Sequence, residues 1–274
     1  MTMQKTPIAH FLKEDIGKGD ITCDMLFKDQ HAEAYIFTKQ PCVLAGLVEA
    51  IDLFTLKRVS VHPMAEDGQI LPKDSTILEM SGRAKDLLCV ERTALNVLSR
   101  MSGIATQTRW LVEKVHRKNQ KCLVAATRKT TPGFRFYEKK AVVIGGGNPH
   151  RFGLFDAVLI KDNHIAMSGG LENVLKKVKK RKIPVEIEVE DIAGALRCAE
   201  VGIEVIMLDN FKPGDAKEAY EAIKKINPTC VVEISGGITP ENIEDYAAFA
   251  DMISLGYLTH TVRPIDFSME YRGG

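Results

Sequence analysis

Six short apolar segments in the second half of the chain are each followed at once by polar residues or glycine. The segments are 122–126, 157–160, 185–189, 205–208, 231–234 and 252–255. The residues that follow them are Arg128 and Lys129, Lys161, Glu190, Asp209, Ser235 with Gly236 and Gly237, and Gly256. Helical patterns separate the segments, an alternation typical of parallel strands joined by helices. Because the carboxyl ends of such strands meet on one rim, these residues are predicted to share an active site. The general polarity of loops explains one or two of them, but not six strand ends in succession.

The predicted rim has a cationic part, made of Arg128, Lys129, His150, Arg151 and Lys161. An Arg side chain can bind a carboxylate or phosphate through two parallel hydrogen bonds. Several cations together therefore indicate a ligand with more than one negative charge. No pair of histidines stands at i, i+4, so a role for His150 in binding a carboxylate is favoured over metal ligation.

The rim also has an acidic pair, Glu190 and Asp209. Such a pair accepts hydrogen bonds from sugar hydroxyls and can hold Mg²⁺, which prefers oxygen ligands and phosphate-bearing substrates. The alternative from the pattern alone is that these carboxylates only pair with the rim cations as salt bridges.

The turns at Ser235-Gly236-Gly237 and at Gly256 carry exposed backbone N–H groups next to predicted helix starts. Such turns bind phosphate, and the last two strands are the usual phosphate position in α/β barrels. Glycine that merely makes a turn is the alternative for either turn alone. Lys129 and Lys161 also match the strand-end lysines of Schiff-base aldolases, which are the main enzymatic competitor.

The elements that position this rim fall into two parts. The first hundred residues form a mixed α/β pattern, with strands predicted at 32–38 and 76–80 and a helix at 47–56. A long helical pattern from Lys85 past Trp110 follows, with Gly103 as a point of weakness or close packing. The second half predicts an α/β barrel rather than a dinucleotide-binding sheet, because no G-x-G-x-x-G sequence follows its first strand. With six strands, this barrel is expected to be smaller than the usual eight-stranded one.

Bulk composition limits the function classes. The chain has 274 residues, 45% of them hydrophobic, and a net charge of +1, so no global field favours nucleic acid or an anionic membrane. No apolar stretch reaches the ~20 residues that a spanning helix needs. The six cysteines show no C-x-x-C spacing, which excludes a zinc knuckle. A cytoplasmic enzyme of one or two domains is expected.

Several motifs occur together in a fixed order along nearly the whole chain. They are Lys13-Glu14-Asp15-Ile16-Gly17-Lys18-Gly19-Asp20, Glu91-Arg92-Thr93-Ala94-Leu95-Asn96, Ser102-Gly103-Ile104-Ala105-Thr106, Thr127-Arg128-Lys129-Thr130-Thr131-Pro132-Gly133, Gly145-Gly146-Gly147 with His150-Arg151, Asp156 to His164, Glu188-Val189-Glu190, Met207-Leu208-Asp209-Asn210 and Ser235-Gly236-Gly237-Ile238. This ordered set resembles the quinolinate phosphoribosyltransferase family.

The resemblance implies a fold and a reaction. The fold is an N-terminal α/β sandwich, residues 1–103 with 264–274 returning to it, and an open parallel, TIM-like α/β barrel of roughly seven strands, residues 104–263. The reaction is a pentosyl transfer in NAD biosynthesis: quinolinate and phosphoribosyl pyrophosphate, with Mg²⁺, give nicotinate mononucleotide, pyrophosphate and CO₂. A homodimer or higher homo-oligomer is implied, with the sandwich of one subunit covering the barrel of the next.

The resemblance also implies roles for the motif residues. The quinolinate carboxylates are expected at Arg128, Lys129, His150, Arg151 and Lys161, joined by Arg92 from the neighbouring subunit. Glu190 and Asp209 are expected to bind the ribose hydroxyls and Mg²⁺, and Ser235, Gly236, Gly237 and Gly256 the 5′-phosphate. Lys129, Lys161, Glu190 and Asp209 are the expected catalytic residues.

Two positions depart from the family pattern: Ala126 replaces an Asp, and Pro149 replaces an Asn. Both changes are similar to a paralogous branch associated with molybdenum transport loci, whose acceptor differs. Arg92 and the Lys161 to His164 motif favour quinolinate. A metabolite-binding protein that has lost catalysis remains the non-enzymatic alternative.

Overall fold

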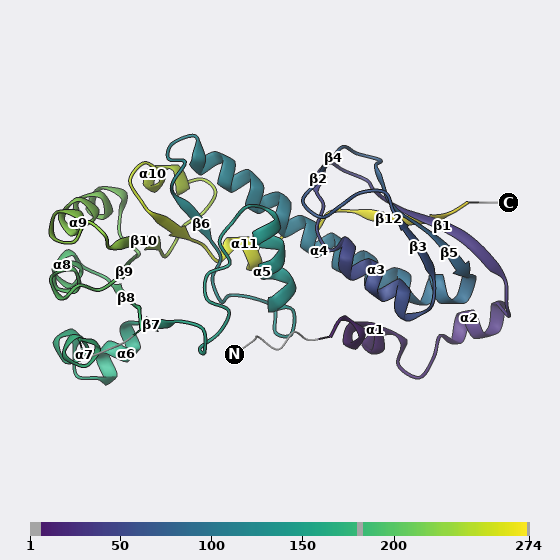
Figure 1. Ribbon diagram of the computed structural model, residues 1–274, viewed down its shortest axis with the longest axis horizontal. Coiled ribbons are helices and arrows are strands. Elements are labelled where there is room, and N and C mark those ends of the chain that lie inside the picture. Colours follow the sequence, from purple (N-terminus) through teal and green to yellow (C-terminus); the bar gives the residue numbers. More distant parts are fainter. Residues whose placement is uncertain (1–6, 180–182, 273–274) are drawn as a thin grey trace. The chain divides into compact units, whose positions relative to one another are not determined.

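The chain forms two compact units in the computed structural model, which describes residues 7–179 and 183–272. The barrel unit consists of Trp110–Lys129 and Gly147–His260. The sandwich unit consists of the chain up to Arg109, Thr130–Gly146 and the residues from Thr261 onward. Helix α4 (Ala84–His116) contributes to both units (Figure 1). Within the described ranges, no helix combines the length and apolarity needed to cross a membrane.

The barrel unit is built on a parallel sheet with the spatial order β6-β11-β10-β9-β8-β7. Its strands are β6 (Leu123–Ala125), β7 (Val158–Ile160), β8 (Val185–Val189), β9 (Val205–Asp209), β10 (Val231–Ser235) and β11 (Met252–Ser254). Its further helices are α6 (Asp162–Met167), α7 (Leu171–Val178), α8 (Ile192–Val201), α9 (Pro213–Ile226), α10 (Ile243–Ala247) and α11 (Tyr257–His260). The open parallel α/β barrel predicted from the sequence is therefore confirmed, and each predicted strand differs from the observed one by at most two terminal residues.

The barrel has six strands within the described residues, rather than the roughly seven that the resemblance implies. At the outer edge of β6, residue Asn148 forms a parallel bridge with Ala125. The backbone N–H of Asn148 donates to Val124 O (2.8 Å), and the N–H of Ala126 donates to Asn148 O (2.9 Å). An irregular segment thus occupies the edge where another strand would lie.

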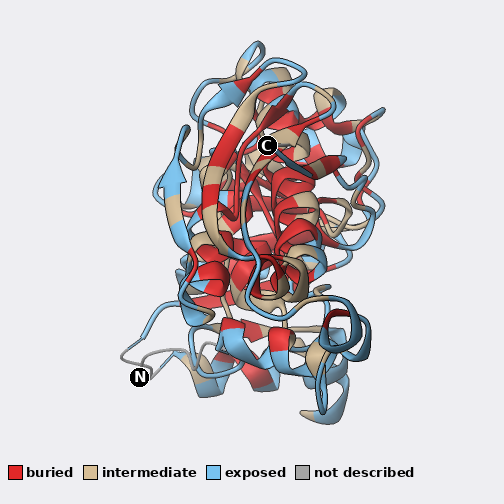
Figure 2. Ribbon diagram, turned by 90° about the vertical axis from the view of Figure 1, so that its right-hand side faces the viewer, coloured by how far each residue is buried: buried red, intermediate tan, exposed pale blue. Residues whose placement is uncertain are grey.

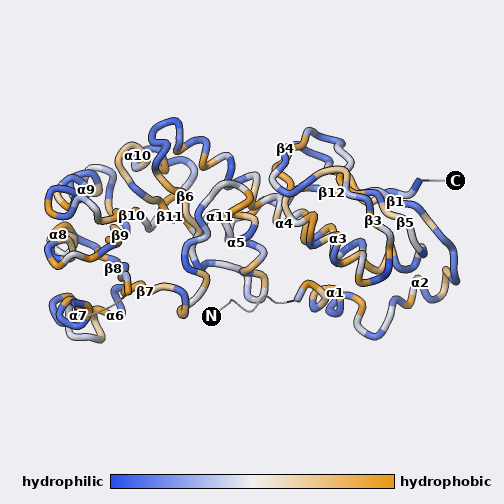
Figure 3. The backbone as a smooth tube through the Cα atoms, in the orientation of Figure 1, coloured by the Kyte–Doolittle hydropathy of each residue, from blue (hydrophilic) through white to orange (hydrophobic). Residues whose placement is uncertain are grey.

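Local sequence signals explain where the outer helices begin and end. The Asp191 side chain accepts the Gly194 N–H (2.6 Å) and caps the start of α8. Gly202 ends α8 in the left-handed region (φ +80°), and Pro213 occupies the first turn of α9, where its missing N–H costs little. Along α7, α8 and α9 hydrophobic and hydrophilic positions alternate with the helical period (Figure 3), so each helix covers the sheet with one face.

The sandwich unit contains an antiparallel sheet with the order β12-β1-β5-β3. Its strands are β1 (His31–Thr38), β3 (Ser60–Pro63), β5 (Thr76–Arg83) and β12 (Phe267–Tyr271), with a separate pair β2 (Cys42–Val43) and β4 (Ile70–Leu71). Its further helices are α1 (Ile8–Ile16), α2 (Ile21–Leu26), α3 (Leu47–Leu56) and α5 (Arg135–Ile144). Buried positions concentrate on the inward sides of strands and helices (Figure 2). On β1 they are Ala34, Ile36 and Thr38, one side of the predicted alternation.

Helix α4 continues through Gly103 without a break. A Cβ at Gly103 would lie 2.5 Å from the carbonyl oxygen of Arg263, so glycine is needed for close approach of the segment that leads into β12. The predicted weakness at Gly103 is therefore a packing contact.

Candidate active site

The carboxyl ends of the barrel strands surround a cavity of about 870 Å³. Most of the predicted site residues line it, namely Arg128, Lys129, His150, Arg151, Lys161, Asp209, Ser235, Gly236, Gly237 and Gly256. They come together because each follows or precedes a strand of one parallel sheet, whose ends share an edge.

Two predicted residues do not line the cavity. Arg92 lies on an exposed face of α4 in the sandwich unit. Glu190 lies beyond the end of β8 and is exposed to solvent.

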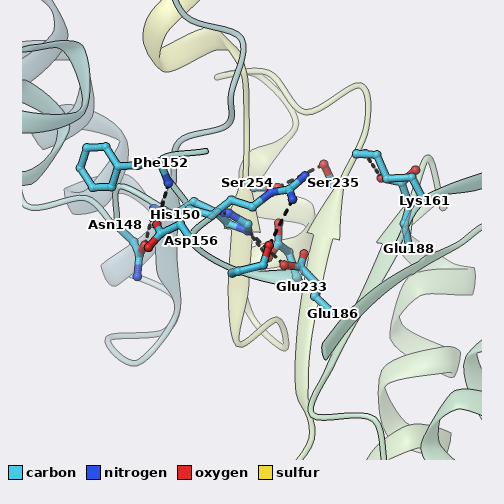
Figure 4. A network of polar contacts seen from close by, with 12 residues as sticks. Asn148, His150, Phe152, Asp156, Lys161, Glu186, Glu188, Glu233, Ser235 and Ser254 are labelled. Atoms are coloured by element: carbon cyan, nitrogen blue, oxygen red, sulfur yellow. Dashed lines mark hydrogen bonds and ion pairs between the residues drawn. The ribbon is translucent and has the colours of Figure 1, made fainter. Parts of the chain in front are cut away.

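The acidic residue of β8 that does line the cavity is Glu188. Glu186, Glu188 and Glu190 alternate along the chain, so their side chains leave the strand on the same side. Glu188 is still inside the strand, is buried, and forms an ion pair with Lys161 at the end of β7 (Figure 4). The carboxylate of β8 that lines the cavity is thus two residues before Glu190, the residue predicted from the sequence. The alternating Glu residues were the signal that could have found Glu188.

Asp209, at the end of β9, lies in a concentration of negative charge. Burial raises the pKa of its carboxyl, and Glu188 and Glu190 raise this pKa further, while Lys161 and Lys129 lower it. The Asn210 side-chain amide donates to Asp209 Oδ2 (2.6 Å). A site that disfavours the charged form of Asp209 fits a divalent cation with oxygen ligands, because such an ion offsets the repulsion between these carboxylates.

The turn after β10 approaches the neighbouring strand closely. Gly236 and Gly237 both have positive φ (+79° and +62°), and a Cβ at Gly236 would collide with Asn210. Ser254 on β11 donates a hydrogen bond to Ser235 Oγ (3.1 Å). Gly236 and Gly237 thus line the cavity beside these two hydroxyl groups, and turns with this backbone conformation are typical anion-binding sites.

Gly256 begins the short turn after β11. A Cβ there would lie 2.7 Å from Lys129 Cδ and 2.8 Å from His260 Cδ2. Because Gly256 has no side chain, the aliphatic part of Lys129 can pack against this turn, which is the second predicted phosphate site.

The cationic part of the cavity contains two arginines that repel each other. Burial lowers the pKa of Arg151, and the charge of Arg128 lowers it further, while Glu186 and Glu188 oppose both effects. Arg151 Nη1 donates to the carbonyl oxygen of Ala157 (3.3 Å). An anionic ligand beside Arg128 and Arg151 would relieve this repulsion.

Both ring nitrogens of His150 are engaged inside the protein. The backbone N–H of Arg151 donates to Nδ1 (2.8 Å), and Nε2 lies 3.2 Å from Glu233 Oε2 and 3.5 Å from Glu186 Oε2 (Figure 4). Burial lowers the pKa of His150, whereas hydrogen bonds to the two carboxylates raise it. The Arg151 N–H opposes a second proton on the ring because it already occupies Nδ1. The hydrogen bonds therefore describe a ring whose single proton is on Nε2.

The inward residues Glu186, Glu233 and Ser254 were not predicted from the sequence. They lie within strands rather than after them, in segments whose apolar neighbours dominate the pattern. Glu233 is two residues before Ser235, so the two-residue period of a strand places both side chains on the same face.

Comparisons with known proteins agree with this arrangement. Residues 20–102 match the family model "Quinolinate phosphoribosyl transferase, N-terminal domain", and residues 104–270 match the corresponding C-terminal domain. A probable nicotinate-nucleotide pyrophosphorylase [carboxylating] of Archaeoglobus fulgidus is 42% identical over 92% of this chain and 97% of its own length. The human nicotinate-nucleotide pyrophosphorylase [carboxylating] is 36% identical over 87% of this chain and 82% of its own.

Solved structures show the same likeness. The crystal structure of the nicotinate-nucleotide pyrophosphorylase from Ehrlichia chaffeensis superposes with a TM-score of 0.93 at 32% identity, covering 99% of this chain and 100% of that one. With family models matching both its sandwich and its barrel residues, this chain belongs to the quinolinate phosphoribosyl transferase family.

Proposed function

We propose that this chain transfers the phosphoribosyl group of phosphoribosyl pyrophosphate to quinolinate and releases pyrophosphate and CO₂, giving nicotinate mononucleotide for NAD biosynthesis. The observation that carries the proposal is the cavity at the strand ends, where arginines and lysines face carboxylates and two glycine turns. Membership of the family supports the same reaction.

Quinolinate has two carboxylates, and the cavity has a matching group of cations. Arg128 and Arg151 repel each other in the free protein, so a dianion between them stabilises both. Lys129 is exposed at the rim and adds a third cation. Both nitrogens of His150 are engaged, so its contribution is to hold Arg151 rather than to bind the substrate directly.

The ribose and the metal belong on the opposite side, at Asp209 and Glu188. These carboxylates accept hydrogen bonds from ribose hydroxyls, and Glu188 takes the role that the sequence pattern gave to Glu190. Mg²⁺ would be held by Asp209 together with Glu188, the lining carboxylate that raises the pKa of Asp209. When bound, the ion neutralises charge on the departing pyrophosphate. The 5′-phosphate fits the turns at Ser235 to Gly237 and at Gly256.

The proposed chemistry follows from this placement. The pyridine nitrogen attacks the anomeric carbon as the bond from that carbon to pyrophosphate breaks. Positive charge develops on the ribose, and the nearby Glu188 and Asp209 stabilise it. The ring nitrogen is then cationic, so the bond to the adjacent carboxylate breaks with its electron pair left on the ring, and a proton from solvent completes the product. The protein chiefly orients two anionic reactants that would otherwise repel.

The Schiff-base alternative is disfavoured by the surroundings of the lysines. The Lys161 amine is engaged in an ion pair with Glu188, so it is directed at a carboxylate rather than free to attack a carbonyl substrate. Lys129 is exposed instead of lying in an apolar pocket that would activate it.

Pro149 is compatible with an intact site. The Asn148 side-chain oxygen accepts the His150 N–H (2.7 Å) across Pro149, an Asx-turn in which the fixed φ of proline fits. The departure from the family pattern at this position therefore supports the turn that carries His150.

As a further part of the proposal, the working enzyme is a homodimer or higher oligomer in which Arg92 enters the neighbouring cavity. Arg92 is exposed on α4, as a residue that serves another subunit must be before assembly.

The first test is an assay of the purified protein with quinolinate, phosphoribosyl pyrophosphate and Mg²⁺, following nicotinate mononucleotide and CO₂. We expect product that disappears in EDTA and falls by about 100-fold or more in Lys129→Ala. No product, together with thermal stabilisation by phosphoribosyl pyrophosphate, would show that the acceptor is not quinolinate. Neither product nor stabilisation would contradict the phosphoribosyl site itself.

A further inference from the structure

A cluster of three ionisable residues, two of which (His150 and Glu233) line the cavity, has no direct part in the proposed chemistry. His150 stands between Glu186 of β8 and Glu233 of β10, although β9 separates these two strands in the sheet (Figure 4). Glu233 is 0% exposed and Glu186 is 7% exposed. One oxygen of each carboxylate, Oε1 in both, has no hydrogen-bond partner among the described residues. Leaving a buried carboxylate oxygen without a hydrogen bond is unfavourable, so the cluster requires an explanation.

A metal ion is one candidate occupant, because the three possible ligand atoms lie within 4.8 Å of one another. The hydrogen bond from the Arg151 N–H to Nδ1 argues against it. With Nδ1 accepting, the ring proton is on Nε2, and this N–H points at the carboxylates. A protonated Nε2 has no lone pair for a metal. The cluster is therefore a hydrogen-bonded network.

The network holds a strained turn in place. His150 has a φ of +52°, in the left-handed region that is unfavourable for a residue with a side chain. The segment is fixed before the turn by the backbone pairing of Asn148 with β6, and at the turn by the His150 ring, which reaches β8 and β10. The next residue is Arg151, whose own N–H completes the network at Nδ1.

The same carboxylates offset the charge of Arg151. Burial and Arg128 both disfavour the Arg151 cation, whereas Glu186 favours it. Glu186 Oε2 in turn lies 3.5 Å from His150 Nε2, so the ring that accepts the Arg151 N–H also contacts the carboxylate that favours the Arg151 cation. The network thus supplies both a geometric and an electrostatic support for one cation of the cavity.

We propose that Glu186 and Glu233 are positioning residues that act through His150 to present Arg151 to a carboxylate of the acceptor. The proposal rests on the proposed function, which supplies quinolinate as that acceptor.

The kinetic test compares Glu186→Gln and Glu233→Gln with Glu218→Gln, a matched control on the exposed face of α9. Each buried variant is expected to raise the KM for quinolinate about tenfold, to leave the KM for phosphoribosyl pyrophosphate within about twofold, and to change kcat less than KM. Glu218→Gln should match the unmodified protein. Equal KM values for quinolinate in all three variants would overturn the proposal while leaving the proposed function intact.

A double-mutant cycle separates positioning from a general loss of structure. In the Arg151→Lys background, Glu233→Gln should add less than about a twofold change in the KM for quinolinate, because its effect passes through Arg151. Factors that multiply instead would show that Glu233 acts independently of Arg151 and would refute the inference.

A measurement without turnover keeps the inference testable if quinolinate is not the substrate. Amide hydrogen exchange of the Arg151 N–H should be about tenfold faster in Glu233→Gln than in Glu218→Gln, since the ring that accepts this N–H is released. If the Gln variants fail to fold, His150→Gln, which leaves both carboxylates in place, should give the same faster exchange. Unchanged exchange in the folded variant would exclude the positioning role.

Discussion

The alternation of acidic residues along β8 decides which carboxylate can take part in the chemistry. Glu186, Glu188 and Glu190 leave the strand on the same side, but each meets a different environment. Glu186 lies below the cavity against His150, Glu188 lines it against Lys161, and Glu190 is exposed beyond the strand. Successive steps of two residues thus lead from Glu186, which contacts His150, to Glu188, which lines the cavity, and to Glu190, which is exposed to solvent.

Separate substitutions of Glu188 and Glu190 test the assignment. Glu188→Gln is expected to lower kcat/KM by about 100-fold, because it removes a charge that faces the ribose and the partner of Lys161. Glu190→Gln, the matched control, should cost less than about fivefold, because only its distant field reaches Asp209. Steady-state kinetics with both substrates provides the measurement, and the reverse order of effects would return the role to Glu190.

At the scale of elements, the junctions between strands and helices carry the binding groups. The turn after β10 needs glycine twice in succession, and Gly236 has no space for a side chain beside Asn210. The turn after β11 needs glycine at position 256, because a Cβ there would collide with the side chain of Lys129. Both turns, which the sequence predicts as phosphate sites, line the cavity. The close approach of Gly236 to Asn210 could not be predicted from the sequence.

Gly236→Ala tests the turn after β10. The added methyl collides with Asn210 and strains a left-handed backbone, so we expect a loss of about 1 kcal/mol or more in the free energy of unfolding and about a tenfold higher KM for phosphoribosyl pyrophosphate. Gly214→Ala is the control, since no atom lies within 4 Å of a Cβ there and its φ is not positive. Chemical denaturation and initial rates measure both. A neutral Gly236→Ala would show that the turn does not bind the phosphate.

At the scale of the whole molecule, the exposed position of Arg92 requires explanation. The cavity is lined entirely by residues of the barrel unit, whereas Arg92 belongs to α4 in the sandwich unit. In the proposed oligomer, Arg92 of one subunit would bind the substrate in the cavity of a neighbouring subunit.

Mixing two inactive variants tests the shared site. Arg92→Ala and Lys129→Ala should each cripple activity, and a mixture after subunit exchange should recover about a quarter of the normal activity, because half of the dimers are mixed and each then has one intact site. Arg92→Ala mixed with the double variant should recover nothing. If subunit exchange is demonstrated and no activity returns, Arg92 does not act across an interface.

The sequence by itself determined the parallel barrel and most of the rim residues, because both depend on the order of short apolar strands and on the residue that follows each one. The order of the strands can be taken directly from the sequence. Because parallel strands end at one shared edge of the sheet, the residues that follow them lie close together. Only the tertiary structure decided that Glu188, and not Glu190, lines the cavity, since this depends on where β8 ends relative to its neighbours. It also decided that His150 meets Glu186 and Glu233, residues 36 and 83 positions away in the chain. No local pattern encodes that meeting, because it requires a left-handed turn on one side of the barrel and two inward carboxylates from strands that are not adjacent.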